Sequence, residues 1–296
     1  MTAHLVTLRQ KSMTWWTFFR VSIEERLVYR ADFALGTLMR FMQVVILIFL
    51  YAAIYETVAP PTNETAAAEG IETTAQIQGY TFNNVIAYVL LVYISRAFSS
   101  MPGLTSGIAT QVRNGEIKKF LIQPVDMLGC LMLQRVAHKL VYYLIAILPF
   151  AFVFFLARGY FEDGWPSLEV MIVFLVSLLL GFLLGYFLEA CLGLVSFWLL
   201  EISSLTFVYM LLSFLLSGHM FPLDWIPSEP INFRYAVDCL PFKYLAYFPA
   251  AVFLGKVSGE DMYWGLIGEL AWVIFFAVLA RILWQRGVKR YSGFGG

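Results

Sequence analysis

The sequence is poor in charge, in cysteine and in histidine. Only 14% of its 296 residues are charged, and 20 basic residues balance 20 acidic ones, so the formal net charge is zero. A chain without an excess of positive charge has no overall attraction to nucleic acid, which we therefore exclude as a partner. The three cysteines show neither a disulfide framework nor metal-site spacing, and we expect them to be small buried apolar side chains.

Sequence motifs of enzymes are missing as well. The three histidines are far apart, so the H-E-x-x-H motif of zinc enzymes is absent. The sequence contains neither a G-x-S-x-G nucleophile motif nor a phosphate-binding loop. We therefore expect no catalytic residue, no metal site and no cofactor in this chain. If the protein uses ATP, a partner subunit must bind it.

Apolar residues are what the sequence has in excess. They make up 60% of the chain, and the mean hydropathy is +0.74. A soluble domain has about 45–50% apolar residues, and a helix that crosses the hydrocarbon core needs about 20 of them in a row. The sequence therefore predicts an all-α polytopic membrane protein with a single transmembrane domain over residues 1–296. Its six predicted spans are residues 33–55, 81–98, 140–157, 168–188, 202–218 and 262–284.

The basic residues predict how these spans are oriented. Five lie before the first span, six lie at or between the second and third spans, and four lie at the C-terminal end. Because basic residues accumulate on the cytoplasmic side, six spans with both termini in the cytoplasm are predicted. A seventh apolar segment, residues 240–254, contains two prolines and a lysine and would move the C-terminus to the other side. We therefore do not count it as a span.

Three segments outside the spans have patterns of their own. Residues 1–31 are predicted to form a cytoplasmic or interfacial helix with a ridge of Trp15, Phe19, Ile23 and Leu27. Residues 99–139 form the largest cytoplasmic segment. Residues 219–261 form an outer segment whose prolines and aromatic residues predict short re-entrant or interfacial helices.

The cytoplasmic segment contains a predicted turn followed by a short helix. Asn114-Gly115 predicts the turn, and Pro124 ends the helix. We expect Ile117 and Leu121 to pack inward, while the charged side chains of this stretch stay in water. A solvated connecting loop and a docking helix for a cytoplasmic partner explain the pattern equally well.

Two charged residues fall well inside the predicted spans, Arg40 in the first and Glu269 in the last, whereas Arg96, Glu169 and Arg281 lie within three residues of the end of a span. An ionisable group in a span is costly and usually functional. Arg40 is near enough to the end of its span to reach the interface, so Glu269 is the stronger functional candidate. Gly181 and Gly185 have the small-xxx-small spacing that predicts close helix packing.

Several short motifs together resemble a known family. They are GEIKKFLIQP at 115–124, FW at 197–198, SGHMFP at 217–222, LPF at 240–242, YFP at 247–249 and YSGFGG at 291–296. Each motif is short, but their order and spacing over nearly the whole chain resemble the permease subunits of bacterial type-2 ABC exporters, the ABC-2 family.

The resemblance implies an assembly and a mechanism. Two permeases, either two copies or a copy and a paralogue, would form the translocation pathway among the lipids of the bacterial plasma (inner) membrane. Two copies of a cytoplasmic ATP-binding subunit would dock beneath them and bind the ATP. The residues implied to couple to the ATPase are Arg113, Glu116, Ile117, Lys118, Lys119 and Leu121. Those implied to line the pathway are Phe82, Asn83, Tyr88, Phe207 and Tyr209, on the second and fifth spans.

Two other functions remain open at this stage. An ion-driven secondary transporter should show an inverted repeat and broken helices at mid-membrane, and the sequence shows neither. A membrane-anchoring assembly subunit without transport activity would also explain a docking helix. An aromatic, weakly charged pathway suits amphiphilic drugs, lipids or lipid-linked products better than ions.

Overall fold

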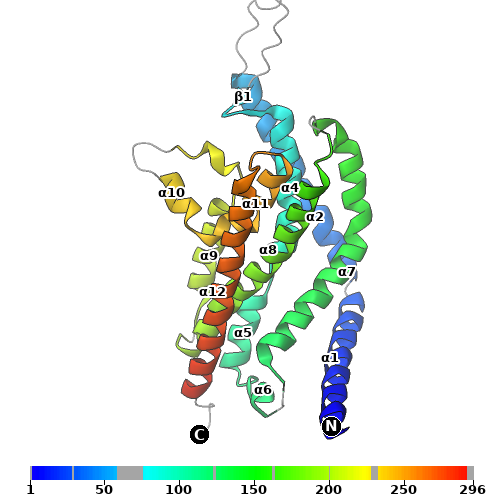
Figure 1. The fold of residues 1–296 in the computed structure, drawn as a ribbon, viewed down its shortest axis with the longest axis vertical. Helices are drawn as coiled ribbons and strands as arrows, with labels where there is room; N and C mark the ends of the chain where they lie inside the picture. Colours follow the sequence, from blue (N-terminus) through cyan, green and yellow to red (C-terminus); the bar gives the residue numbers. More distant parts are fainter. Residues whose placement is uncertain are drawn as a thin grey trace, which may run out of the picture.

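Helices make up almost all of the described chain, as Figure 1 shows. The computed structural model describes residues 2–28, 30–58, 76–122, 125–161, 164–199, 201–227 and 233–291. Within these ranges the only strands are β1 (Gln76–Ile77) and β2 (Tyr80–Thr81), which pair antiparallel as a small hairpin. The predicted all-α class is therefore confirmed.

The helices differ greatly in length. The long ones are α1 (Thr2–Val28), α2 (Arg30–Val58), α4 (Phe82–Ser99), α7 (Met127–Leu156), α8 (Leu168–Leu194) and α12 (Glu260–Arg290). The shorter α-helices are α5 (Leu104–Arg113), α6 (Lys118–Ile122), α9 (Ser203–Leu216), α10 (Phe233–Asp238) and α11 (Tyr247–Phe253). Single turns of 3-10 helix are η1 (Ala157–Tyr160), η2 (Val195–Phe197), η3 (Leu223–Trp225) and η4 (Pro241–Leu245).

Five helical segments of the described chain are long and apolar enough to cross a membrane. They are Phe41–Val58, Phe82–Arg113, Met127–Tyr160, Leu168–Phe197 and Glu260–Arg290, and they overlap the first, second, third, fourth and sixth predicted spans. The fifth predicted span corresponds to α9, which is apolar but has only 14 residues. This is shorter than the stretch of about 20 residues that a straight span needs. The fifth predicted span, and with it the total of six spans, therefore stays a prediction.

The predicted cytoplasmic segment 99–139 is more helical than a connecting loop. The chain breaks after α4 at Met101–Gly103, where Gly103 adopts a left-handed conformation (φ 73°), and continues as α5 and α6. Helix α7, which contains nearly all of the third predicted span, begins at Met127, well before the predicted start of that span at residue 140. Asp126 explains this start, because its side chain accepts a hydrogen bond from the Gly129 N–H as an N-cap.

Helix α8 lies at the centre of the molecule and contacts α4, α5, α11 and α12. Its glycines let other backbones approach. A Cβ at Gly185 would overlap the carbonyl group of Ser99, and one at Gly193 would lie 2.9 Å from the Ile108 Cβ. The close packing predicted for Gly181 and Gly185 is therefore confirmed, and it brings the end of α4 and the start of α5 against α8.

Helix α1 packs along α7 rather than standing alone. Trp15, Phe19 and Ile23 are partly buried, and the Trp15 ring fills the space above Gly129. These three residues of the predicted ridge lie on the face that contacts α7, whereas the fourth, Leu27, is 47% exposed in the last turn of α1. Whether α1 lies at the membrane interface stays a prediction.

Other predictions are wrong or concern residues that the structure does not describe. Cys130 and Cys191 are buried as expected, but Cys239 is exposed, because it sits in the turn after the short helix α10. The Arg40 side chain and Pro124 lie outside the described residues, as does the YSGFGG motif beyond its tyrosine.

Candidate functional site

The chain reverses direction between α5 and α6, in a stretch that we call the inner turn (residues 113–122). Gly115 adopts a left-handed conformation (φ 76°), and a Cβ there would lie 3.3 Å from the Tyr291 hydroxyl. The N–H of Ile117 donates to the carbonyl of Gln111 at 3.3 Å, which closes the turn. The predicted turn at Asn114-Gly115 and the short helix after it are therefore confirmed.

The inner turn has an anchored side and an exposed side. Ile117 has no exposed surface and packs in a cluster with Val112 and Met127, and Phe120 packs against the same cluster. The inward position predicted for Ile117 is confirmed, but the one predicted for Leu121 is wrong: Leu121 is 44% exposed and Ile122 is 83% exposed. The reason is the length of α6, whose five residues offer one inward face that Phe120 already occupies.

The charged residues of the inner turn point into solvent, as predicted. Arg113, Glu116, Lys118 and Lys119 are exposed. The Arg113 guanidinium lies 3.5 Å from a Glu201 carboxylate oxygen, which links the inner turn to the chain just before α9. Glu116 and Lys119 form a weak pair at 4.0 Å within the inner turn. Their exposure leaves these side chains able to contact a partner protein.

An ion pair joins the start of α7 to the last membrane helix. Arg281 on α12 bonds both carboxylate oxygens of Asp126, with Nη2 3.0 Å from Oδ2. Burial alone would raise the pKa of Asp126, but the bonds from Arg281 and from the Gly129 N–H outweigh it and lower the pKa. Asp126 thus serves at once as the N-cap of α7 and as its link to α12.

Side chains from α7 and α8 satisfy the backbone at the break between α4 and α5. Lys139 is buried and donates from Nζ to the carbonyls of Ala97 and Ser100, the latter at 2.6 Å. On the other side of the break, the Met101 N–H donates to a Glu189 carboxylate oxygen at 3.3 Å. The sequence did not reveal these roles, because both charges fit the positive-inside pattern or a cytoplasmic turn equally well.

The predicted pathway residues do not gather in one place. Phe82 and Asn83 lie in the first turn of α4, where the Phe82 ring contacts Tyr55 and Tyr160. Tyr88 has no exposed surface and donates to the carbonyl of Gly218 at 2.5 Å. The remaining two, Phe207 and Tyr209, are on α9.

Helix α9 contacts the rest of the chain along a narrow strip. Phe207 is 61% exposed, whereas Tyr209 is partly buried with its ring 6.3 Å from that of Phe242. Ser213 is the one buried residue of this helix, and Arg96 on α4 donates to its hydroxyl at 3.3 Å. This polar contact between α4 and α9 could not be predicted from the sequence, because Arg96 and Ser213 are 117 residues apart in the chain.

The outer segment is held by a network that we call the outer clasp: Tyr80, Asp224, Arg234, Asp238, Lys243 and Tyr247. Asp224 accepts hydrogen bonds from the hydroxyls of Tyr80 (2.6 Å) and Tyr247 (2.7 Å). Arg234 lies 3.3 Å from Asp224 and 2.8 Å from Asp238, so it joins the two carboxylates. Burial and the Asp224 charge raise the pKa of both tyrosines, which keeps their hydroxyls protonated as donors.

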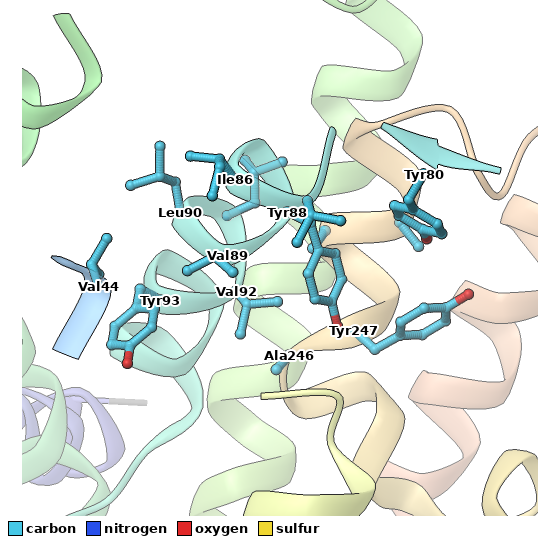
Figure 2. Close-up of a cluster of buried hydrophobic side chains, with 14 of the residues drawn as sticks. Val44, Tyr80, Ile86, Tyr88, Val89, Leu90, Val92, Tyr93, Ala246 and Tyr247 are labelled. Carbon is cyan, nitrogen blue, oxygen red and sulfur yellow. The ribbon is translucent and has the colours of Figure 1, made fainter. Parts of the chain in front are cut away.

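Tyrosines from the membrane helices fix the backbone of the outer segment as well. Tyr51 on α2 donates to the Met220 carbonyl, and Tyr88 on α4 donates to the Gly218 carbonyl. Figure 2 shows Tyr88 reaching from α4 toward Ala246 and Tyr247. The segment forms the short helices η3, α10, η4 and α11, of which η4 and α11 pack on α4 and α8, while α10 packs on η4. Whether they re-enter the membrane stays a prediction.

Glu269 lies in the contact between α8 and α12. It has no exposed surface, and one of its oxygens accepts a hydrogen bond from the Ser177 hydroxyl at 2.8 Å. Its other oxygen, Oε1, has no hydrogen-bond partner among the described residues. No group of three or more His, Cys, Asp or Glu side chains in the described ranges could hold a metal ion.

One comparison with known proteins identifies a family for this chain. The chain matches the family model of ABC-2 family transporter proteins over residues 71–295, which includes α4, the inner turn, the outer segment and α12. A search of curated proteins gives no match. With several helices apolar enough to cross a membrane, the protein is a multi-pass membrane permease. The family match covers most of the chain, and the protein therefore belongs to the ABC-2 family of transporter proteins.

Proposed function

We propose that this permease forms half of the pathway of an ATP-driven exporter in the bacterial inner membrane. A separate cytoplasmic ATPase subunit, present in two copies, binds the ATP and docks on the inner turn. The observation that carries this proposal is the two-sided inner turn. Ile117 and Phe120 anchor it in the core, while Arg113, Lys118 and Leu121 remain exposed outside the long helices. A segment of this kind can pass a partner's movement to the helices behind it.

The rest of the assembly follows from the fold. The start of α1, the inner turn and the end of α12 lie at one end of the molecule, with the β hairpin at the other (Figure 1). This supports six spans with both termini cytoplasmic, with α9 as the short span. The exposed apolar residues of α9, among them Phe207 and Met210, support a second permease, a copy or a paralogue, packed against this helix. The amphiphilic substrate class proposed above rests on the aromatic side chains of α4 and α9.

Reconstitution with the ATPase tests the proposal. The permease and its ATPase would be purified together, placed in lipid nanodiscs, and assayed for ATP hydrolysis with and without the permease. We expect the permease to change the hydrolysis rate and Glu116→Arg to abolish that change, because the substitution reverses a charge on the docking face. Glu56→Arg is the matched control, since Glu56 is also exposed but lies on α2 at the opposite end.

Three results separate the candidate functions. An ATPase that neither binds the permease nor responds to it contradicts the exporter. Binding without any effect on hydrolysis or transport indicates a membrane-anchoring assembly subunit. Transport in proteoliposomes that continues on an ion gradient without the ATPase indicates a secondary transporter.

A further inference from the structure

A groove of about 600 Å³ lies at the cytoplasmic end of the molecule, between the inner turn and the end of α12. We call it the inner groove. Phe120, Leu121 and Val125 form one wall, and Trp284, Val288 and Lys289 form the other. Neither the family match nor the resemblance drawn from the sequence assigns a role to α12 at this end.

The floor of the inner groove is rigid, whereas its mouth is apolar and open. Phe120 and Trp284 pack against the same buried cluster, and the Trp284 ring lies 6.0 Å from that of Phe197. Leu121, which lines the groove, and its neighbour Ile122 are exposed and belong to α6, which lies at the end of the molecule opposite the β hairpin (Figure 1). Exposed large apolar side chains outside the membrane mark a protein contact surface.

The charges around the groove indicate what kind of surface it contacts. Lys289 lines the groove and is exposed, and Lys118 and Lys119 are exposed on the inner turn just before Phe120 in the sequence. Among the described residues that line the groove, the one acid is Asp126, and Arg281 already bonds both of its oxygens. The groove therefore presents an apolar centre with a basic rim, which is complementary to an apolar side chain flanked by acidic residues.

We propose that the ATPase subunit docks on a surface in two parts, the inner turn and the end of α12, by inserting an apolar side chain with acidic neighbours into the inner groove. This inference rests on the proposed function, because it takes the ATPase as the occupant. Leu121 belongs to the inner turn and also lines the groove with residues of α12, so the inner turn and the groove form a continuous surface. The Asp126–Arg281 pair joins the walls, and movement of the ATPase would therefore reach α7 and α12 together.

Single cysteines test the contact in the whole complex. In a Cys239→Ser background the two remaining cysteines are buried, so Leu121→Cys, Val288→Cys and Arg286→Cys each add one accessible thiol. The rate of maleimide modification would be measured in inside-out vesicles with and without the ATPase subunit. We expect the ATPase to slow modification of Cys introduced at 121 and 288, and to leave position 286, which is exposed outside the groove, nearly unchanged.

A charge-reversal pair tests the chemistry of the rim. Lys289→Glu should weaken ATPase binding about tenfold, because it places like charges in contact across the interface. Arg286→Glu makes the same charge change one helical turn away and outside the groove, and it should have a much smaller effect. Both side chains are exposed, so neither substitution disturbs the core.

The outcomes distinguish failure of this inference from failure of the proposed function. Protection at position 121 without protection at 288 overturns the inference and leaves docking at the inner turn intact. Protection at neither position, with no ATPase bound, overturns both. A thiol at 288 that is slow without ATPase and fast after deletion of residues 292–296 shows that the chain's own C-terminus fills the groove, which also overturns the inference.

Discussion

Glu269 shows how a single side chain is constrained by the membrane interior. Its carboxyl group is fully enclosed between α8 and α12, where the Ser177 hydroxyl is the hydrogen-bond donor to one oxygen. No cation pairs with it in the described part of the chain. A buried and unpaired charge costs several kcal/mol, even after the protein relaxes around it. The site therefore favours a neutral side chain of the same shape.

We predict that Glu269→Gln is tolerated and that Glu269→Lys is not. Glutamine keeps the shape and an oxygen that can accept from Ser177, whereas lysine adds a charge and length to a closed contact. The melting temperature of the purified permease should change by only a few degrees for Glu269→Gln, since the expected cost is about 1 kcal/mol or less. Glu269→Lys should lower the yield of folded protein sharply.

The opposite ranking would change the interpretation of this residue. If Glu269→Gln destabilises the permease as much as Glu269→Lys, the ionised carboxylate is required in the fold. If it leaves stability unchanged but stops transport, Glu269 takes part in the transport cycle. Ser177→Ala serves as the control for loss of the hydrogen bond alone, at an expected cost of about 1 kcal/mol.

At the scale of elements, the break between α4 and α5 depends on a side chain from another helix. Lys139 on α7 donates to two carbonyls at the end of α4, and Tyr143 donates to one of them at 3.1 Å. Without the lysine, the Ser100 carbonyl would lose this donor and the Ala97 carbonyl would keep only the bond from Tyr143. Lys139 thus fixes the direction in which the chain leaves α4 for the inner turn.

Replacing Lys139 by methionine should loosen this break. The substitution keeps most of the apolar stem but removes the donor, and we expect a loss of about 1–3 kcal/mol because the Ser100 carbonyl loses its bond from the lysine. Amide hydrogen exchange should rise at residues 97–103 while the middle of α8 stays protected. Lys118→Met is the matched control, because that lysine is exposed. Equal exchange in the two variants would contradict the capping role.

The Asp126–Arg281 pair predicts a dependence of stability on pH. The folded-state pKa of Asp126 is lowered, so its contribution is present above the unfolded-state pKa of about 4 and is lost as pH falls through the folded value. Wild type should therefore melt above Asp126→Asn near neutral pH, and the difference should shrink below about pH 4. Thermal unfolding in detergent from pH 7 to 3 measures this. A difference that stays constant would assign the effect to capping geometry instead of charge.

The sequence predicts some of these elements well, for a physical reason. The long helices that contain five of the spans are continuous apolar runs, because lipid and core both require apolar side chains around them. The glycine spacing on α8 and the Asn-Gly turn are local signals, and the structure confirms both. Local patterns of this kind can be identified without knowing what packs against them.

The other features depend on partners that are distant in sequence. The sequence does not show that Lys139 and Glu189 satisfy backbone groups 39 to 88 residues away. It also does not predict the start of α7 at Met127, because the apolar run of the third span begins only at residue 140, yet a helix can extend beyond the membrane with polar side chains on it. Leu121 was placed inward because its periodicity does not show how short α6 is.

On the scale of the whole molecule, two networks lie at opposite ends of one helical frame. The outer clasp joins the β hairpin to the outer segment, while the Asp126–Arg281 pair and Lys139 hold the inner turn in place. Helix α4 runs from one to the other, since Tyr88 contacts the outer segment and its last turn meets Lys139. Changes at the outer end should therefore be separable from ATPase docking, provided that α4 stays folded.

Loosening the outer clasp tests this separation. Asp224→Asn keeps the shape of the side chain but removes the charge that accepts from two tyrosine hydroxyls and pairs with Arg234. Tyr80→Phe removes one of the donors. In a double-mutant cycle of thermal stability the two changes should be coupled by about 1–2 kcal/mol, because they remove the same charge-assisted hydrogen bond. A pair of exposed charged side chains at the surface would give a smaller coupling energy.

Substrate transport and retention of the ATPase should then change independently of each other. Because the clasp fixes the outer segment, we expect Asp224→Asn to alter substrate transport or to raise passive leak of a small dye from proteoliposomes. Retention of the ATPase on the purified permease should stay unchanged, because the inner turn lies at the other end (Figure 1). Tyr235→Phe, on α10 and 67% exposed, is the control for a tyrosine outside the clasp. Loss of ATPase retention in Asp224→Asn would show that the two ends are rigidly connected through α4, and the separation proposed here would be wrong.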